Sequence, residues 1–425
     1  MLEITRLRTD SDQIREALRK RGLHETDLQN IDRALELDRQ RRALQTELDE
    51  NLNQAKQHAK AIGSLYKQGK REEADAAKQE VAKLKDSGKQ LQKKLQETER
   101  HLDDTLYLLP NAPHDLVPSG TSEEDNEVFQ EASELPTLDP DAKPHWEIAE
   151  QYGIFDLELG VKITGSGFPV YRPNGAKLQR ALINFFLDRA GAAGYQEYQV
   201  PHLVNEDTAR ATGQLPDKEG QMYHAERDDL YLIPTAEVPL TNIYRDVLLK
   251  EEELPIKLTG YTPCFRREAG SYGAHVRGLN RVHQFDKVEI VQVVHPDKSY
   301  EALDDMLDHV RALLSDLGLP YRILRLCGGD LGFTSALTYD FEVWSAAQQR
   351  WLEVSSVSNF ETFQSNRLKL RYRDGKKNRL AHTLNGSALA LPRIVACILE
   401  NNQTPEGIRV PEVLRPYLGD RAIIA

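Results

Sequence analysis

Cysteine is scarce in this sequence of 425 residues, and the cysteines that occur are far apart. Cys264, Cys327 and Cys397 form no CxxC pair, which argues against a disulfide framework and against a zinc ribbon. The chain also lacks any run of about eighteen apolar residues, and its polar N-terminus has no apolar signal core. We therefore expect a soluble cytoplasmic protein without a membrane-spanning segment.

Two glycine motifs of nucleotide-binding proteins are missing as well. No GxGxxG follows a predicted strand and no GxxxxGK[ST] occurs, so we do not expect a Rossmann or P-loop nucleotide site. The formal net charge of −12 argues against a basic protein that coats nucleic acid.

The charge is nevertheless uneven along the chain. Residues 111–425 carry the net negative charge, whereas basic side chains outnumber acidic ones by about two to one between residues 54 and 96. This local excess suggests contact with a polyanion, and a solvated helix surface with Glu–Lys pairs is the alternative. The basic residues are Lys56, Lys60, Lys67, Lys70, Arg71, Lys78, Lys83, Lys85, Lys89, Lys93 and Lys94.

Proline is absent between Asp27 and Pro110, and apolar residues recur there at alternating steps of three and four. This spacing predicts two coiled-coil helices, and the glycine-bearing stretch 63–70 between them predicts a turn. We expect an antiparallel arm of about 50–60 Å. A dimerisation or spacer role is as compatible with it as contact with DNA, RNA or an acidic protein. The predicted seam consists of Leu37, Arg41, Leu44, Leu48, Asn51, Ala55, His58 and Ile62, then Ala77, Val81, Leu84, Gly88, Leu91, Leu95, Thr98, Leu102, Thr105 and Leu109.

A segment rich in proline and acidic residues separates the arm from a region of mixed pattern. We predict an arm over 1–110, a linker over 111–139 and a second domain over 140–425. In the second domain, helical spacing over 176–193, 300–317 and 391–401 alternates with strand-like spacing over 338–360. The sequence thus predicts an α+β fold with an antiparallel sheet flanked by helices.

The stretch FRREAGSYGAHVRGLNRVHQFDKVE, residues 265–289, predicts a strand, a loop and a returning strand. The loop contains Gly270, Ser271, Gly273 and Gly278. Guanidinium groups are rarely buried without an anionic partner, so this hairpin is either a solvated surface or an anion-binding site.

This stretch closely resembles the second signature motif of class II aminoacyl-tRNA synthetases, in the form carried by seryl-tRNA synthetases. LIPTAEVPLTN (232–242) resembles the serine-binding TAE loop of that family. WLEVSSVSNFETFQSNR (351–367) resembles its ATP- and metal-facing strand, and LNGSALALPRIVACILEN (384–401) its third motif. VPHLV (200–204) resembles the first motif, at the dimer interface, and the arm resembles the tRNA-binding domain. The resemblance covers essentially the whole chain, in order.

The resemblance implies that serine and ATP give seryl-adenylate, and that the seryl group then passes to the 3′ end of tRNA(Ser). Arg266 then grips the serine carboxylate and the α-phosphate, while Arg281 and Arg393 bind the outer phosphates. Glu268 accepts from the adenine amino group, and Phe285 stacks on the base. The implied ATP site comprises Arg266, Arg267, Glu268, Val282, Phe285, Glu353, Val354, Ser355, Ser356 and Arg393, with Glu353 and Ser356 as Mg²⁺ ligands.

The implied serine site comprises Thr235, Ala236, Glu237, Arg266, Glu289, Asn385 and Ser387. Glu289 and Ser387 are the expected partners of the substrate hydroxyl, and Thr235 and Glu289 those of its ammonium. A site that hydrogen-bonds a hydroxyl rejects analogues that lack it, because its buried polar groups would stay unpaired. Two residues depart from the family pattern: Arg267 stands where serine is frequent, and Pro392 where glycine often precedes the arginine.

The implied partners are tRNA(Ser), bound through residues 30–105, and a second copy of the chain in a homodimer. No zinc set is expected. The sequence leaves open whether selenocysteine tRNA is a second acceptor. The alternatives are a different class II synthetase, a related ligase that charges a carrier protein, and a non-catalytic RNA-binding scaffold derived from a synthetase. The arm argues against the carrier ligase, and Arg266, Glu353 and Arg393 argue against the scaffold.

Overall fold

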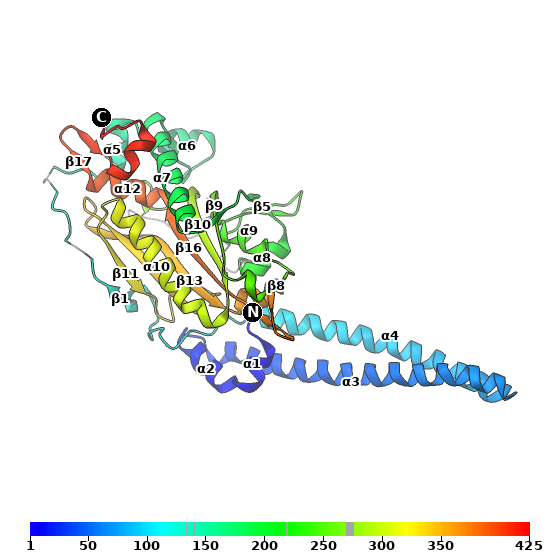
Figure 1. The fold of residues 1–425 in the computed structure, drawn as a ribbon. Helices are drawn as coiled ribbons and strands as arrows, with labels where there is room; N and C mark the ends of the chain where they lie inside the picture. Colours follow the sequence, from blue (N-terminus) through cyan, green and yellow to red (C-terminus); the bar gives the residue numbers. More distant parts are fainter. Residues whose placement is uncertain (133, 139–140, 218–219, 269–275) are drawn as a thin grey trace. The chain divides into compact units, whose positions relative to one another are not determined.

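The computed structural model describes residues 1–425 except 133, 139–140, 218–219 and 269–275. The chain separates into two compact units. The first contains Met1–Arg19 and Leu23–Pro110, and the second contains Lys20–Gly22 and Asn111–Ala425. A helical first unit and a second unit built on a mainly antiparallel sheet confirm the predicted α+β fold (Figure 1). No helix among the described residues is long and apolar enough to cross a membrane.

The first unit is an antiparallel helical hairpin with two short helices at its base. α1 (Ile4–Thr9) and α2 (Ser11–Arg19) precede the long helices α3 (Glu25–Lys67) and α4 (Arg71–Tyr107), which run side by side in Figure 1. The predicted turn over 63–70 is too long, because α3 continues through Gly63 to Lys67. Gly69, with φ of 78°, supplies the left-handed conformation that the tight turn requires.

The seam between the long helices is apolar in the middle of the arm. Leu48, Leu91 and Leu95 form a buried cluster with Leu44 beside it. Leu37 and Arg41, predicted as seam residues, are half-buried, whereas Ala34 and Asp38 are fully buried in the same part of α3. Besides α4, α3 contacts α1, and Arg8 of α1 lies against Asp38.

Asp38 is fully buried at the base of the arm and is held by three arginines. Its carboxylate lies 3.4 Å from Arg8, 3.0 Å from Arg41 and 3.1 Å from Arg42. Opposite charges supply the compensation that a buried carboxylate needs. Further along the seam, Asn51 lies against Gly88, where a Cβ atom would come within 2.9 Å of the Asn51 side-chain oxygen.

The second unit is organised around an eight-stranded sheet with the order β1-β11-β12-β13-β16-β10-β9-β4. All neighbouring strands are antiparallel except β4 and β9. The strands are β1 (Glu127–Gln130), β4 (Gln196–Glu197), β9 (Ile256–Phe265), β10 (Gln284–Val294), β11 (Tyr321–Arg325), β12 (Leu337–Ser345), β13 (Arg350–Glu361) and β16 (His382–Ala390). β1 lies within the predicted linker, where four residues amid prolines and acids gave no readable strand pattern.

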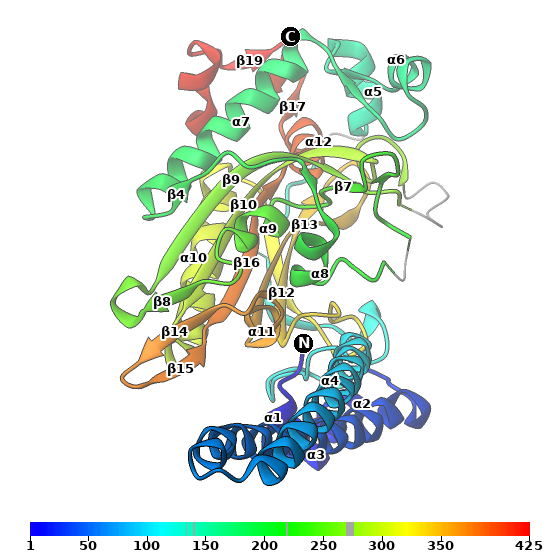
Figure 2. The same cartoon turned by 90° about the vertical axis from the view of Figure 1, so that its right-hand side faces the viewer.

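Helices α7 (Pro173–Ala192), α10 (Ser299–Asp316) and α12 (Leu391–Asn401) cover one face of this sheet. They form the main core with alternate residues of the strands, such as Val288 and Ile290 of β10. Figure 2 shows α9 (Glu237–Asn242) and α8 (Glu206–Thr212) on the opposite side of the strands from α10. There Leu240 of α9 packs on Val291. The predictions of a helix over 176–193, 300–317 and 391–401, and of strands over 338–360, are confirmed.

Smaller elements complete the second unit, and each is short. The helices are α5 (His145–Tyr152), α6 (Leu157–Ile163) and α11 (Phe363–Leu368). The strands are β2 (Phe155–Asp156), β3 (Val170–Tyr171), β5 (Leu203–Val204), β6 (His224–Ala225), β7 (Leu230–Leu232), β8 (Leu248–Lys250), β14 (Arg371–Asp374), β15 (Lys377–Leu380), β17 (Gln403–Thr404), β18 (Gly407–Arg409) and β19 (Ile423–Ile424). Among the described residues, 3₁₀ segments lie at Glu123–Asp125, Glu251–Glu253, Pro296–Lys298 and Glu412–Leu418.

Candidate active site

A cavity of about 590 Å³ lies in the second unit, between the hairpin β9–β10, the strands β13 and β16 and the segments 213–217 and 221–222. Its wall combines arginines, carboxylates and hydroxyls with a few apolar side chains, as small-molecule sites do. The residues expected from the sequence that line it are Thr235, Glu237, Arg266, Glu268, Arg281, Val282, Phe285, Glu353, Val354, Ser355, Ser387 and Arg393. The structure thus brings residues from five sequence segments to one place.

Arg266 lies where the β9 strand leaves the sheet. Its Nε donates to the Pro234 carbonyl at 3.3 Å, and its guanidinium carbon lies 5.3 Å from the centre of the Phe285 ring. Among the described residues, no carboxylate lies within ion-pair distance of Arg266. A cation that lines a cavity without a protein counter-charge is suited to an anionic ligand.

The other two arginines already have carboxylate partners. Arg281 Nη1 lies 3.0 Å from Glu268, so the residue expected to read adenine and a residue expected to bind phosphate form an ion pair. Arg393 donates from Nε to the Asn280 carbonyl at 2.9 Å and from Nη1 to the Glu353 carbonyl at 2.7 Å. Its Nη1 also lies 3.7 Å from the Glu353 carboxylate. A polyphosphate can take over these guanidinium groups, because it carries more charge than one carboxylate.

Several expected site residues lie outside the wall. Arg267 is exposed and donates only its backbone N–H to Gln221. Ala236 is fully buried in the cluster around Leu240 and Val291. Glu289, Asn385 and Ser356 are not among the residues that line the cavity. The expected loop glycines Gly270 and Gly273, with Ser271, lie outside the described residues.

A β-bulge explains how Glu353 and Ser356 can act together. Residues three apart on a regular strand point to opposite faces of a sheet. Here Glu353 pairs with Glu342 and Ser356 with Asp340, and the register shifts by one residue between these pairs. Because Glu342 and Asp340 are two apart, Glu353 and Ser356 lie on the same face.

This face offers oxygen donors of the kind that Mg²⁺ prefers. Asp340 lies beside Glu353 and Ser356 as a third residue of this face. Its Oδ1 atom is buried and has no hydrogen-bond partner among the described residues. Burial above all, and the neighbouring Glu353 in addition, raise the pKa of Asp340. The donors fit a magnesium ion held by one or two protein oxygens and by phosphates. Within the described ranges, no three His, Cys, Asp or Glu side chains converge as a metal-binding group.

Glu289 is the centre of a buried polar cluster at the other end of the cavity. Its carboxylate accepts from Thr235 Oγ1 at 3.2 Å and from Asn385 Nδ2 at 3.0 Å, and it lies 2.7 Å from Lys287 Nζ. Ser387 faces Glu289 across the β10–β16 pair. Burial raises the pKa of Glu289, and Lys287 opposes that shift. The cluster places hydroxyl, amide and carboxylate groups beside the cavity, which suits a small polar ligand.

Glu237 lies beside this cluster on the same side of the cavity. It is 7% exposed and accepts a hydrogen bond of 2.6 Å from Gln364. Gln364 in turn accepts from Thr383 at 2.8 Å, so the amide orientation is fixed. Burial and the charge of Glu289 raise the pKa of Glu237 from 4.5 to about 7. Ionisation of Glu237 is therefore less favourable in the folded protein than in the unfolded chain, which lowers the free energy of unfolding at neutral pH.

Replacing Glu237 by glutamine should change how stability depends on pH. A carboxyl group whose pKa is higher in the folded state binds its proton more tightly there, so stability falls as pH rises from about 4.5 to about 7. Gln364 can still donate to the amide oxygen of Glu237→Gln. We expect the variant to be more stable than wild type at pH 8, by about 1–3 kcal/mol, and equal to it near pH 4.5. Urea unfolding at both values measures this, and an equal difference at both would contradict the assignment.

Sequence reasoning missed four parts of the site. Lys287 is one, although its place between Phe285 and Glu289 on alternate positions of one strand is a readable signal. Asp340 becomes visible only through strand pairing. Phe333 and the described parts of the segment 213–222 come from loops without a pattern. Within that segment, Asp217 accepts from the backbone N–H groups of Gln221 and Met222.

Comparison with known proteins agrees with this architecture. Residues 221–402 match the tRNA synthetase class II core domain (G, H, P, S and T), and residues 1–113 match the seryl-tRNA synthetase N-terminal domain. The serine–tRNA ligase of Salinibacter ruber is 52% identical, over 99% of this chain and 98% of its own length.

Two solved structures are similar over the full chain. The seryl-tRNA synthetase of Pyrococcus horikoshii, complexed with ATP, has a TM-score of 0.91 and 32% identity, and covers 100% of this chain and 99% of its own. The cytoplasmic serine–tRNA ligase of Naegleria fowleri, in complex with AMP, has a TM-score of 0.85 and 29% identity, with 100% and 98% covered. The two family models, the sequence relatives and the solved structures agree with each other. This chain therefore belongs to the seryl-tRNA synthetase family.

Proposed function

We propose that this protein is a serine–tRNA ligase, which activates L-serine with ATP and transfers the seryl group to the 3′ end of tRNA(Ser). One observation carries the proposal. Arg266, which has no carboxylate partner among the described residues, lines the same cavity as Thr235 of the cluster around Glu289 and as the arginines 281 and 393. A ligand that fills both regions must place negative charge at Arg266, as a serine carboxylate attacking an α-phosphate does.

The first step is an attack of one anion on another, so the protein must stabilise spreading negative charge. Arg266 is fixed by the Pro234 carbonyl and by Phe285. The remaining N–H donors, at the edge of the planar guanidinium, can then bridge carboxylate and phosphate. Arg281 and Arg393 bind the departing phosphates after exchanging their present carboxylate partners, Glu268 and Glu353. The carboxylate oxygen of serine forms a bond to the α-phosphorus while the bond to the β-phosphate oxygen breaks, which releases pyrophosphate.

The polar cluster holds serine at the opposite end. Glu289 and Thr235 bind the ammonium group. Glu289 accepts a hydrogen bond from the substrate hydroxyl, and Ser387 donates one to it. Asn385 orients Glu289 through the bond of 3.0 Å. Alanine would leave these buried groups unpaired, which costs far more affinity than loss of a methyl group does.

Adenine occupies the part of the cavity lined by Phe285, Val282 and Glu268, where an aromatic face and a carboxylate lie together. Glu353 and Ser356 would hold Mg²⁺, which neutralises phosphate charge when bound. These assignments of single residues rest on the cavity geometry and on the family motifs.

The arm binds the substrate of the second step, the tRNA. Residues 30–105 bind tRNA(Ser), and all of the basic residues between 54 and 96 are exposed along them. Such side chains contact phosphates and give affinity without sequence readout. The arm over 1–110, a connection over 111–139 and the catalytic domain over 140–425 then have separate tasks. The protein works in the cytoplasm as a homodimer, and selenocysteine tRNA is a candidate second acceptor.

The proposal is tested by ATP–pyrophosphate exchange with serine, threonine, alanine and cysteine in turn. We expect exchange with serine to exceed that with alanine by at least about a hundredfold, because the site pairs with a hydroxyl that alanine lacks. A stronger response to another amino acid would identify a different synthetase. No response from folded, magnesium-supplied protein would make the chain a non-catalytic scaffold.

A further inference from the structure

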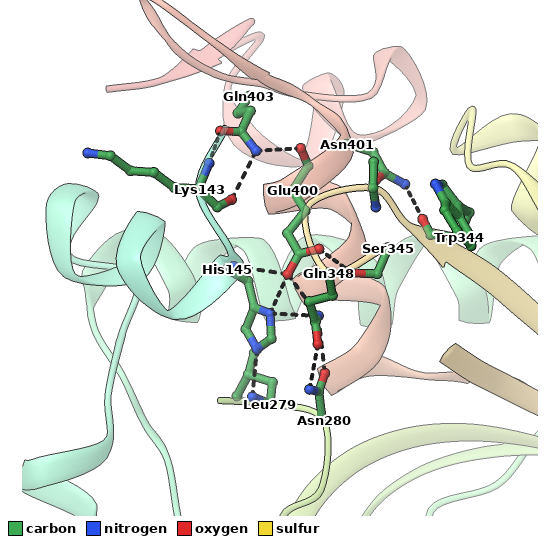
Figure 3. A network of polar contacts seen from close by, with 11 residues as sticks. Lys143, His145, Leu279, Asn280, Trp344, Ser345, Gln348, Glu400, Asn401 and Gln403 are labelled. Atoms are coloured by element: carbon green, nitrogen blue, oxygen red, sulfur yellow. Dashed lines mark hydrogen bonds and ion pairs between the residues drawn. The ribbon is translucent and has the colours of Figure 1, made fainter. Parts of the chain in front are cut away.

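His145, the first residue of α5, is fully buried and uses both nitrogens of its ring (Figure 3). Nε2 lies 2.8 Å from the backbone nitrogen of Leu279, and Nδ1 lies 2.7 Å from Glu400 Oε1. A backbone N–H can only donate, so Nε2 accepts and carries no proton. The ring is therefore neutral, with its proton on Nδ1 donated to Glu400.

Glu400 is a buried carboxylate held by neutral donors. Its Oε1 accepts from the ring and backbone N–H of His145, at 2.7 and 3.0 Å, and from Gln348 Nε2 at 2.9 Å. Ser345 donates to Oε2. Burial alone would raise the pKa of Glu400, but the hydrogen bonds, those from His145 above all, lower it. No lysine or arginine pairs with Glu400 in the described part of the chain. The carboxylate only accepts hydrogen bonds, so each of the neighbouring N–H and O–H groups points toward it.

The same network reaches the cavity wall through Asn280. Asn280 Nδ2 donates to Gln348 Oε1 at 2.8 Å, while the Asn280 carbonyl accepts from Arg393 Nε at 2.9 Å. Leu279, Asn280 and Arg281 all line the cavity. Arg393 and Glu400 belong to the same helix, α12, near its two ends. The carboxylate at one end of α12 thus supports the loop that the arginine at the other end contacts.

Two further contacts fasten this loop to the start of α5. Gly278, with φ of 70°, lies against the imidazole ring, and a Cβ there would come within 2.1 Å of His145 Nε2. The guanidinium carbon of Arg277 lies 4.7 Å from the centre of the Trp146 ring. Residues 277–280 are therefore held at every position by α5, Gln348 or Arg393.

We propose that His145, oriented by Glu400, is a positioning residue for the nucleotide half of the reaction. It holds residues 277–281 so that Arg281 and Arg393 face the triphosphate. It contacts neither the serine cluster around Glu289 nor any reacting atom. The inference rests on the proposed function for the identity of the ligand.

The test separates the two ring nitrogens. In His145→Asn the amide nitrogen can replace Nδ1 toward Glu400, but nothing replaces Nε2. In His145→Gln the amide oxygen can reach the Nε2 position and accept from Leu279. We expect His145→Asn to raise the Kd for magnesium–ATP and the KM for ATP in exchange by about tenfold, the worth of one lost hydrogen bond, with the KM for serine within about twofold. His145→Gln should recover most of that loss.

Calorimetry with magnesium–ATP on the full chain measures the Kd, and exchange measures the split between the two KM values. Equal changes in both KM values, or a lower melting temperature with an unchanged Kd for ATP, would overturn the inference and leave His145 a packing residue. Absence of serine-dependent exchange in wild type would sink the proposed function, and the calorimetric comparison would still decide the inference.

If His145→Asn does not fold, Gln348→Ala carries the test, because Gln348 is a partly exposed turn residue whose loss makes no core cavity. It cuts the link between Glu400 and Asn280, and we expect a rise of about threefold in the Kd for ATP. An unchanged Kd would contradict the inference. The matched control is Gln151→Ala, the same change at an exposed position of α5, which should leave the Kd as in wild type.

Discussion

We expect the Arg266→Ala variant to lose serine-dependent ATP–pyrophosphate exchange by at least about a thousandfold while it keeps its fold. The guanidinium meets charge that grows in the transition state, at a place where the described residues offer no other unpaired cation. Truncation leaves a small gap at the cavity surface and no buried carboxylate without its partner, so stability should change by less than about 1 kcal/mol.

Two variants make this result interpretable. Arg266→Lys keeps the charge but cannot bridge two anions with a planar fork, and should recover only a small part of the activity. Arg373→Ala removes an exposed arginine of β14 that is remote from the cavity and should exchange like wild type. Thermal unfolding of all three shows whether each is folded. Near-normal exchange by Arg266→Ala would refute the role of this residue.

Deletion of residues 30–105, with a short Gly/Ser connection, should separate the two steps of the reaction. We expect exchange with serine to stay within about threefold of wild type, because every cavity residue belongs to the second unit. Charging of tRNA(Ser) should fall by at least about a thousandfold at low tRNA concentration, since the phosphate contacts of the arm supply the affinity. Rates of both reactions on the same preparation measure the effect.

A second form of the arm checks that charge is responsible. Substituting Lys83, Lys85, Lys89 and Lys93 by alanine keeps the helix, and should weaken tRNA charging and flatten its dependence on salt. The exposed Glu97 and the half-buried Glu99, acidic residues on the same helix, serve as the control pair. If the deleted protein still charges tRNA well, the arm is not the tRNA-binding element.

Patterns with long range along the sequence could be predicted well. Leu91 and Leu95 recur with the coiled-coil period, and the structure buries both in the seam. The residues of the hairpin with Arg266, Arg281 and Phe285 indicated either a solvated surface or an anion-binding site, and only the resemblance to class II synthetases chose between them. The structure places all three residues on the cavity wall. Glu289 and Thr235 followed from motifs, and they do contact each other.

What the sequence could not show depends on the third dimension. Glu353 and Ser356 share a face only because of a bulge, and a register shift leaves no mark in the spacing of one strand. At the base of the arm α3 also contacts α1, whose Arg8 lies against Asp38, and the spacing of α3 does not indicate this partner. His145 stands among prolines and acids, 134 residues before its partner Leu279, and no periodicity connects them.

The contact between Asn51 and Gly88 has a consequence for the length of the arm. A leucine seam alone allows two helices to slide by a heptad at little cost, whereas one polar residue can fix the alignment. A slip of seven residues on α4 would set Asn51 against Val81 or Leu95, and the space beside Gly88 would be empty. The Asn51 oxygen has no hydrogen-bond partner among the described residues, so it is retained at some expense of stability. The hairpin therefore has one defined length, and its basic residues lie at fixed distances from its base.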